Sequence, residues 1–130
     1  MPNLEEEARK FMQDKLMITE VITPDLYEKL AGETAIFPKE KALEYLALGL
    51  TSEAGEVAGK VKKLIRDGDD KEGFELKKIA ISHEIGDVLW YCAMMAKEVG
   101  VPLNTIMAEN LEKLHSRKER GTLHGSGDNR

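Results

Sequence analysis

Apolar side chains recur at three- and four-residue intervals along most of this chain, which is the period of an amphipathic helix. The helices that this pattern predicts cover residues 3–18, 38–66, 72–99 and 103–120, with one short helical turn near residues 26–30. Gly68 follows the second of these helices, and Gly100 and Pro102 follow the third, as expected where helices end. Because no alternating strand pattern occurs, we predict an all-α helical bundle.

The composition agrees with helix packing. Aromatic residues make up only 5% of the 130 residues, so Leu, Ile, Val, Ala and Met must fill the core. The length suits one domain, which we assign to residues 1–120 with its core in 38–120. Residues 121–130 form a Gly-rich polar tail, for which two readings stay open: disorder, or a loop that orders on a phosphate.

Charge and targeting signals narrow the class of protein. The net charge of −5 argues against a nucleic-acid polymer as partner, because such proteins usually present a basic face. No apolar run is long enough for a membrane span, and the N-terminus does not resemble a signal peptide. The single Cys92 cannot form an internal disulfide. We therefore expect a soluble, cytoplasmic protein.

Two acidic pairs with matching spacing are the main chemical signal: Glu53-x-x-Glu56 and Glu84-x-x-Asp87. Residues three apart lie on the same face of a helix, and helical phase places both pairs at the border of the predicted core. Carboxylates crowded in this way raise one another's pKa values unless a cation neutralises them. Mg²⁺ or Mn²⁺ is the expected cation, since both favour carboxylate and water oxygens.

A plain alternative stays open at this point, because an acidic chain yields such spacings by chance. The four acids would then be solvated helix residues with partners of their own, such as Glu56 with Lys60. Gly55 and Gly86 favour the functional interpretation. Glycine is unfavourable inside a helix, so we expect a close approach of another backbone or of a ligand at these two positions.

These residues also resemble a known family. The segments 48–58 and 84–91, with their two acidic pairs, resemble the MazG-like all-α nucleoside triphosphate pyrophosphohydrolases, and so does the later run of Asn110, Lys113 and Arg117. The resemblance covers about residues 38–120. It implies a four-helix core completed by a second subunit, in a homodimer or homotetramer. It also implies Mg²⁺-dependent hydrolysis of a (deoxy)nucleoside triphosphate to the monophosphate and pyrophosphate, in the cleansing of nucleotide pools.

The resemblance assigns roles to individual residues. The catalytic, metal-binding residues would be Glu53, Glu56, Glu84 and Asp87. Asn110 would assist at the metal or the phosphates, while Lys113 and Arg117 would bind phosphate oxygens. Lys60 and Lys63 share the acidic face and are further candidates for substrate binding. For the neighbouring Lys62 and Arg66, a favourable position near a helix C-terminus is an equally good explanation.

One departure from the family pattern concerns the general base. Many members carry an additional Glu directly before the first pair, where this chain has Ser52. Three replacements for this Glu stay open: ionisation of water by the metal alone, a carboxylate of the acidic pairs that doubles as base, or a residue from elsewhere. The departure also keeps an alternative open, a non-catalytic helical oligomer that binds nucleotide or a protein partner. Phe11 and Phe37 are candidates for a nucleobase pocket, and Tyr91 for contact with a base or sugar, with core packing as its alternative.

Overall fold

The computed structural model describes residues 22–68 and 70–130, and these are organised as helices with short connections. The elements are α2 (Pro24–Gly32), the short 3₁₀ helix η1 (Lys39–Lys41), α3 (Ala42–Asp67), α4 (Lys71–Val99) and α5 (Leu103–Glu119). The described residues contain no strand, which confirms the all-α prediction. The helix predicted over residues 3–18 and the pocket candidate Phe11 lie outside the described residues.

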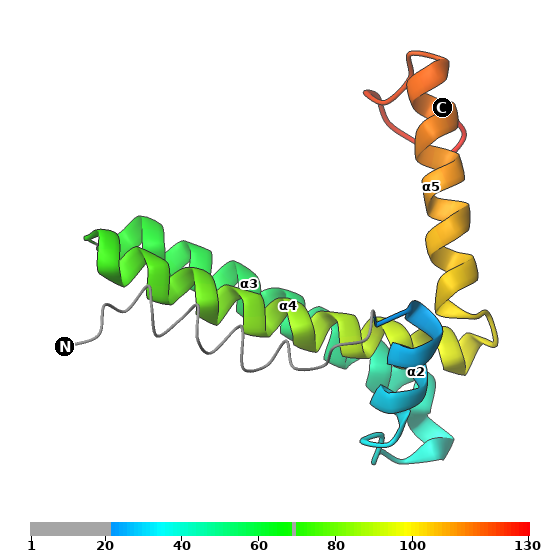
Figure 1. Ribbon diagram of the computed structural model, residues 1–130, viewed down its shortest axis with the longest axis horizontal. Coiled ribbons are helices and arrows are strands. Elements are labelled where there is room, and N and C mark those ends of the chain that lie inside the picture. The colour runs from blue at the N-terminus through cyan, green and yellow to red at the C-terminus, as the bar shows by residue number, and fades with distance from the viewer. Residues whose placement is uncertain (1–21, 69) are drawn as a thin grey trace.

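The two longest helices, α3 and α4, pack side by side as an antiparallel hairpin (Figure 1). Gly68 ends α3 at a φ of +59°, which glycine adopts without steric cost, and its N–H donates to the carbonyl of Leu64. Asp70 begins α4 by accepting a 2.8 Å hydrogen bond from the N–H of Gly73. The predicted break between these helices is therefore confirmed.

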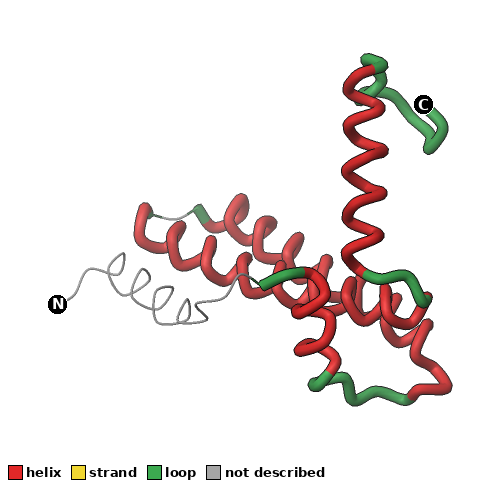
Figure 2. Tube along the Cα trace, turned by 45° about the vertical axis from the view of Figure 1, so that its right-hand side comes forward, coloured by secondary structure: helices red, strands yellow, loops and turns green. Residues whose placement is uncertain are grey.

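The other two helices lie at the end of the hairpin where α4 terminates. α2 packs against α4 and α5, and α5 also contacts α4 (Figure 1). Gly100, in the left-handed conformation at φ +74°, ends α4, and Pro102 precedes α5. After this turn α5 leads away from the hairpin axis, as the rotated view in Figure 2 also shows.

The core of the described chain is small and sits where α2 meets the hairpin. Leu46 is fully buried, together with Ala31, Ala93 and Met94. By contrast, several large apolar side chains of the hairpin are about half exposed or more: Leu48, Ile65, Ile85, Leu89 and Val99. The described residues thus cover the apolar side chains of α3 and α4 only in part.

Trp90 anchors α2 to α4. Its indole Nε1 donates to the hydroxyl of Thr34 at 2.8 Å and lies 3.3 Å from the carbonyl oxygen of Ala31. A half-buried Trp usually satisfies its N–H in this way. The contact fixes the C-terminal end of α2 on the hairpin.

Residues 121–130 fold back onto the end of α5. Arg117 is only 6% exposed, and its Nη2 donates to the carbonyl of Asp128 at 2.9 Å. Arg120 donates in the same manner to the main-chain oxygen of Arg130 at 3.0 Å. Arg117 of α5 and Arg120, the residue directly after this helix, therefore hold the tail through its backbone.

None of the described helices is long and apolar enough to cross a membrane.

Replacing the buried Leu46 by Ala should destabilise the protein by about 2–5 kcal/mol, because it removes buried methyl groups and leaves a cavity. Urea denaturation measures the change. Ile36→Ala is the control, since the Ile36 side chain is 95% exposed and should lose almost nothing. Equal losses for the two variants would contradict this account of the core.

Candidate functional site

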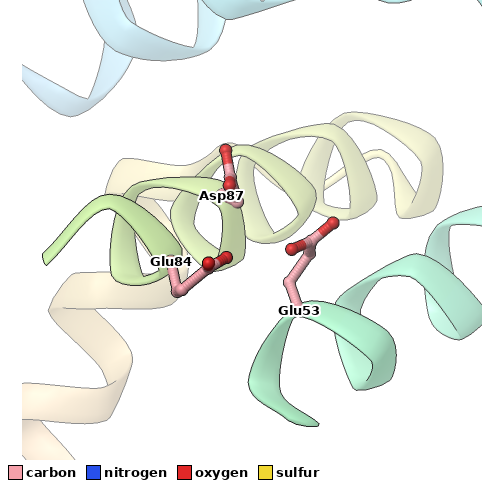
Figure 3. Close-up of side chains that lie close together, drawn as sticks. All are labelled: Glu53, Glu84 and Asp87. Atoms are coloured by element: carbon pink, nitrogen blue, oxygen red, sulfur yellow. The ribbon is translucent and has the colours of Figure 1, made fainter. Parts of the chain in front are cut away.

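Three of the four carboxylates of the two acidic pairs converge between α3 and α4. Glu53 comes from α3, while Glu84 and Asp87 come from α4 (Figure 3). One carboxylate oxygen from each lies within 4.8 Å of the others, and we call these three residues the acidic cluster. Glu53 and Glu84 are partly buried, and Asp87 is exposed. Antiparallel packing of the two helices brings the two acidic pairs to the same level of the hairpin.

The electrostatics of the acidic cluster show the cost of this arrangement. Partial burial raises the pKa of Glu53, and the negative charges of Asp87, Glu84 and Glu56 raise it further. A raised pKa means that the ionised form of Glu53 is disfavoured in the metal-free protein. A divalent cation would relieve the repulsion, and the all-oxygen donor set suits Mg²⁺ or Mn²⁺.

Lys60 is the cation that the chain itself brings to the acidic cluster. Its ammonium nitrogen lies 2.9 Å from Oε1 of Glu84. The pKa of Lys60 is raised, first by this hydrogen bond and then by the charges of Glu84 and Glu56, although partial burial opposes the shift. Lys60 therefore pairs across the hairpin with Glu84 and not, as the plain alternative had it, with Glu56 on its own helix.

The remaining candidates of α3 lie around the cluster without joining it. Glu56 is exposed and is not one of the three converging carboxylates, but its charge acts on both Glu53 and Lys60. Lys63 is also exposed, and its positive charge helps to lower the pKa of Asp67, after the larger effect of Arg66. Lys63 thus lies toward the turn end of the hairpin.

The structure does not bring the three candidates of α5 to the acidic cluster within one chain. Asn110 and Lys113 are exposed on α5, which leads away from the hairpin (Figure 1). Arg117 is buried and donates to the tail carbonyl of Asp128. The physical reason is the turn at Gly100–Pro102, which the sequence marks as a helix break but whose direction depends on packing.

The close approach expected at Gly55 and Gly86 is not made by the described residues. A Cβ atom added at either glycine would meet no heavy atom within 4 Å. The close approach occurs instead at Gly49, where an added Cβ would overlap the ring of Tyr91. The approach expected at Gly55 and Gly86 therefore stays a prediction for another backbone or a ligand. The contact at Gly49 was not predicted, because helical phase does not reveal the register between two helices.

Aromatic side chains border the acidic cluster. Tyr91 lies edge-on to Trp90, with ring centroids 4.9 Å apart, and Phe37 stacks on Tyr45 at 5.4 Å. Burial raises the pKa of Tyr27, and the charge of Asp87 raises it further, which places this α2 phenol near the cluster. Sequence reasoning missed Tyr27 and Tyr45, since no motif or spacing connects either residue with the acidic pairs.

Replacing Glu53 by Gln should stabilise the metal-free protein at neutral pH. The pKa of Glu53 is higher in the folded protein than its ordinary value of 4.5. The stabilisation by protonated Glu53 is therefore complete below pH 4.5 and is lost as the pH rises through the raised pKa. The advantage of the variant should therefore grow with pH above 4.5 and then level off. Urea denaturation in chelator at several pH values measures it.

Glu112→Gln removes the same charge from an exposed position on α5 and serves as the control. Its difference from the wild type should not follow this pH course. A Glu53→Gln advantage that is absent, or that does not change with pH, would contradict the raised pKa that burial and neighbouring charges give Glu53.

Comparison with known proteins identifies the family of the chain. Residues 41–122 match the family described as the MazG nucleotide pyrophosphohydrolase domain. The chain is also 45% identical over 112 residues to the "Gene 37 protein" of Mycobacterium phage L5, an alignment that covers 82% of this chain and 97% of the phage protein. No solved structure matches significantly. Both acidic pairs and the α5 candidates lie inside the matched region, and the chain belongs to the MazG nucleotide pyrophosphohydrolase family.

Proposed function

We propose that this protein is a Mg²⁺-dependent pyrophosphohydrolase that converts a (deoxy)nucleoside triphosphate to the monophosphate and pyrophosphate, removing surplus or non-standard nucleotides. The observation that carries the proposal is the convergence of Glu53, Glu84 and Asp87 from two helices to within 4.8 Å, in a chain of this family. A purely structural role would not require three mutually repelling carboxylates at one place.

The acidic cluster fits a hard divalent cation by its chemistry. Glu53, Glu84 and Asp87 would hold Mg²⁺, with Mn²⁺ as a possible substitute and with Glu56 close by on α3. When bound, the cation supplies charge neutralisation for the triphosphate and polarises water. The residues themselves supply the orientation, because each is fixed on a long helix and not on a loop.

Lys60 has a second role in this proposal. In the metal-free chain its ammonium neutralises Glu84 at 2.9 Å. A cation at the cluster competes for the same carboxylate, which leaves the ammonium available to a phosphate oxygen. Lys60 would thus bind substrate beside the cluster, and Lys63, farther along α3, would extend the basic surface toward the outer phosphates.

The missing acid at Ser52 leaves the general base to another residue. Ser52 is exposed on α3 and its hydroxyl is a poor base. Glu56 belongs to the first acidic pair but is not one of the three residues of the acidic cluster, and it lies on the same helix as Glu53. We assign it the role of accepting the proton of the attacking water.

The α5 candidates support assembly with a second copy. Asn110 and Lys113 do not reach the acidic cluster of their own chain, and large apolar side chains such as Ile85 and Leu89 remain about half exposed on α4. A homodimer or homotetramer would cover this surface and bring α5 of one subunit toward the cluster of another. Such an apolar face is typical of a subunit interface.

The alternative function, a non-catalytic oligomer that binds nucleotide or a protein partner, draws on two observations. Ser52 replaces an expected acid, and Arg117 is engaged by the tail at Asp128 instead of being available to phosphate. A binding protein of this kind would retain nucleotide affinity without turnover, so the assay below separates the two functions.

Incubation with a panel of nucleoside triphosphates and Mg²⁺ should release monophosphate and pyrophosphate in equal amounts. Asp87→Asn should abolish this turnover, because it removes a charged ligand from the cluster, while the circular dichroism spectrum stays helical. Glu98→Gln, at an exposed position near the end of α4, is the matched control. Release of single phosphates, or binding without turnover of any nucleotide, would refute the proposed reaction.

Sedimentation velocity should show a dimer or tetramer at micromolar concentration. Leu89→Glu should shift the population toward the monomer, since it places a charge on the exposed apolar face of α4. Leu123→Glu, at a similarly exposed position in the tail, should leave the assembly intact. A wild-type protein that sediments as a monomer would contradict this part of the proposal.

A further inference from the structure

We infer that Gly49 and Tyr91 are positioning residues, which set the separation of α3 and α4 at the acidic cluster. The ring of Tyr91 lies against the backbone of α3 at Gly49, and we call this contact the tyrosine wedge. The inference rests on the proposed function, since it concerns the same carboxylates, but it assigns a role to two residues outside both acidic pairs.

The wedge is a close contact that only glycine admits. A Cβ atom at residue 49 would overlap the Tyr91 ring, and even Cδ1 of that ring would be only 2.7 Å away. The obstacle is an aromatic ring and not the end of a flexible chain. Any side chain at Gly49 must therefore displace the ring or push the two helices apart.

The wedge lies directly beside the acidic cluster. Gly49 is one helical turn before Glu53 on α3, and Tyr91 is one turn after Asp87 on α4. In an antiparallel pair these two levels are neighbours. A change in helix separation at the wedge is therefore transmitted to the gap between Glu53 and Asp87.

The Tyr91 ring is held from several sides. Trp90 packs edge-on against it at 4.9 Å and is itself bound to Thr34 of the α2 end. Burial raises the pKa of the Tyr91 phenol, and Tyr45, which is hydrogen-bonded to it, raises the pKa further. Tyr45 lies one turn before Gly49 on the same helix. The ring consequently acts as a fixed spacer.

A fixed spacer matters because the carboxylates of the cluster repel one another across the helix interface. A metal site needs its ligands held within about 0.5 Å of a productive arrangement. The position of Gly49 inside a long helix also requires a reason, because glycine is unfavourable there. Gly59, in the same helix, has no atom within 4 Å of an added Cβ and provides a matched control.

The test is isothermal titration of the metal-free protein with Mn²⁺, together with thermal unfolding and near-ultraviolet circular dichroism in chelator. Gly49→Ala should weaken Mn²⁺ binding on the order of tenfold to a hundredfold, as loss of a residue that orients metal ligands does. Gly49→Ala should also lower the melting temperature and alter the aromatic circular dichroism signal, although Ala has a higher helix propensity than Gly. Gly59→Ala should raise the melting temperature and leave Mn²⁺ binding unchanged.

The same substitution in a Tyr91→Ala background isolates the contact. There Gly49→Ala should change Mn²⁺ affinity by no more than about twofold, because the ring that it displaces is gone. If Gly49→Ala does not fold, Tyr91→Phe should keep wild-type affinity and Tyr91→Leu should lose it, since only Phe retains the ring.

Equal effects of Gly49→Ala in both backgrounds, or an affinity that Gly49→Ala leaves unchanged, would overturn the wedge alone. Equal Mn²⁺ affinities of the Tyr91→Phe and Tyr91→Leu variants would also overturn the wedge alone. A wild-type protein that binds no Mn²⁺ would instead overturn the proposed metal site, and the positioning role with it.

Discussion

The packing of two long helices holds three carboxylates together although they repel one another. This repulsion is the main physical constraint on the site. Glu53 on one helix faces Glu84 and Asp87 on the other, and partial burial, followed by these negative charges, raises the pKa of Glu53. The folded chain partly offsets this cost with Lys60, whose ammonium neutralises Glu84. In the proposed function, a divalent cation at the acidic cluster would offset the rest of this cost.

Two long helices carry the acidic cluster. Both sides of the cluster belong to helices of more than six turns, which packing and not intrinsic propensity must stabilise. The fully buried core around Leu46 lies at one end of the hairpin, and the Trp90–Thr34 hydrogen bond anchors α2 there. Farther along the hairpin, separation depends on local contacts such as that between Tyr91 and Gly49.

The proposed association of subunits would account for both the exposed apolar residues and the direction of α5. A chain that buries only a small core leaves much hydrophobic free energy unrealised, and association is the usual way to gain it. The same association would bring Asn110 and Lys113 to an acidic cluster that their own chain keeps remote. In the single chain Arg117 instead stabilises the tail through the carbonyl of Asp128.

The sequence by itself determined the helices and the chemical character of the site. Apolar periodicity located α3, α4 and α5 to within a few residues, and Gly68 and Gly100 marked their ends, because these signals are local. The acidic pairs were visible for the same reason, since spacing along one helix fixes which side chains share a face.

Only the tertiary structure decided which of these residues meet. It joined Glu53, Glu84 and Asp87 but left Glu56 outside the three, and it paired Lys60 with Glu84 across the hairpin. It also placed the close approach at Gly49. Each of these outcomes depends on the register and separation of two helices. That register results from packing between residues far apart in the sequence, which no local pattern records.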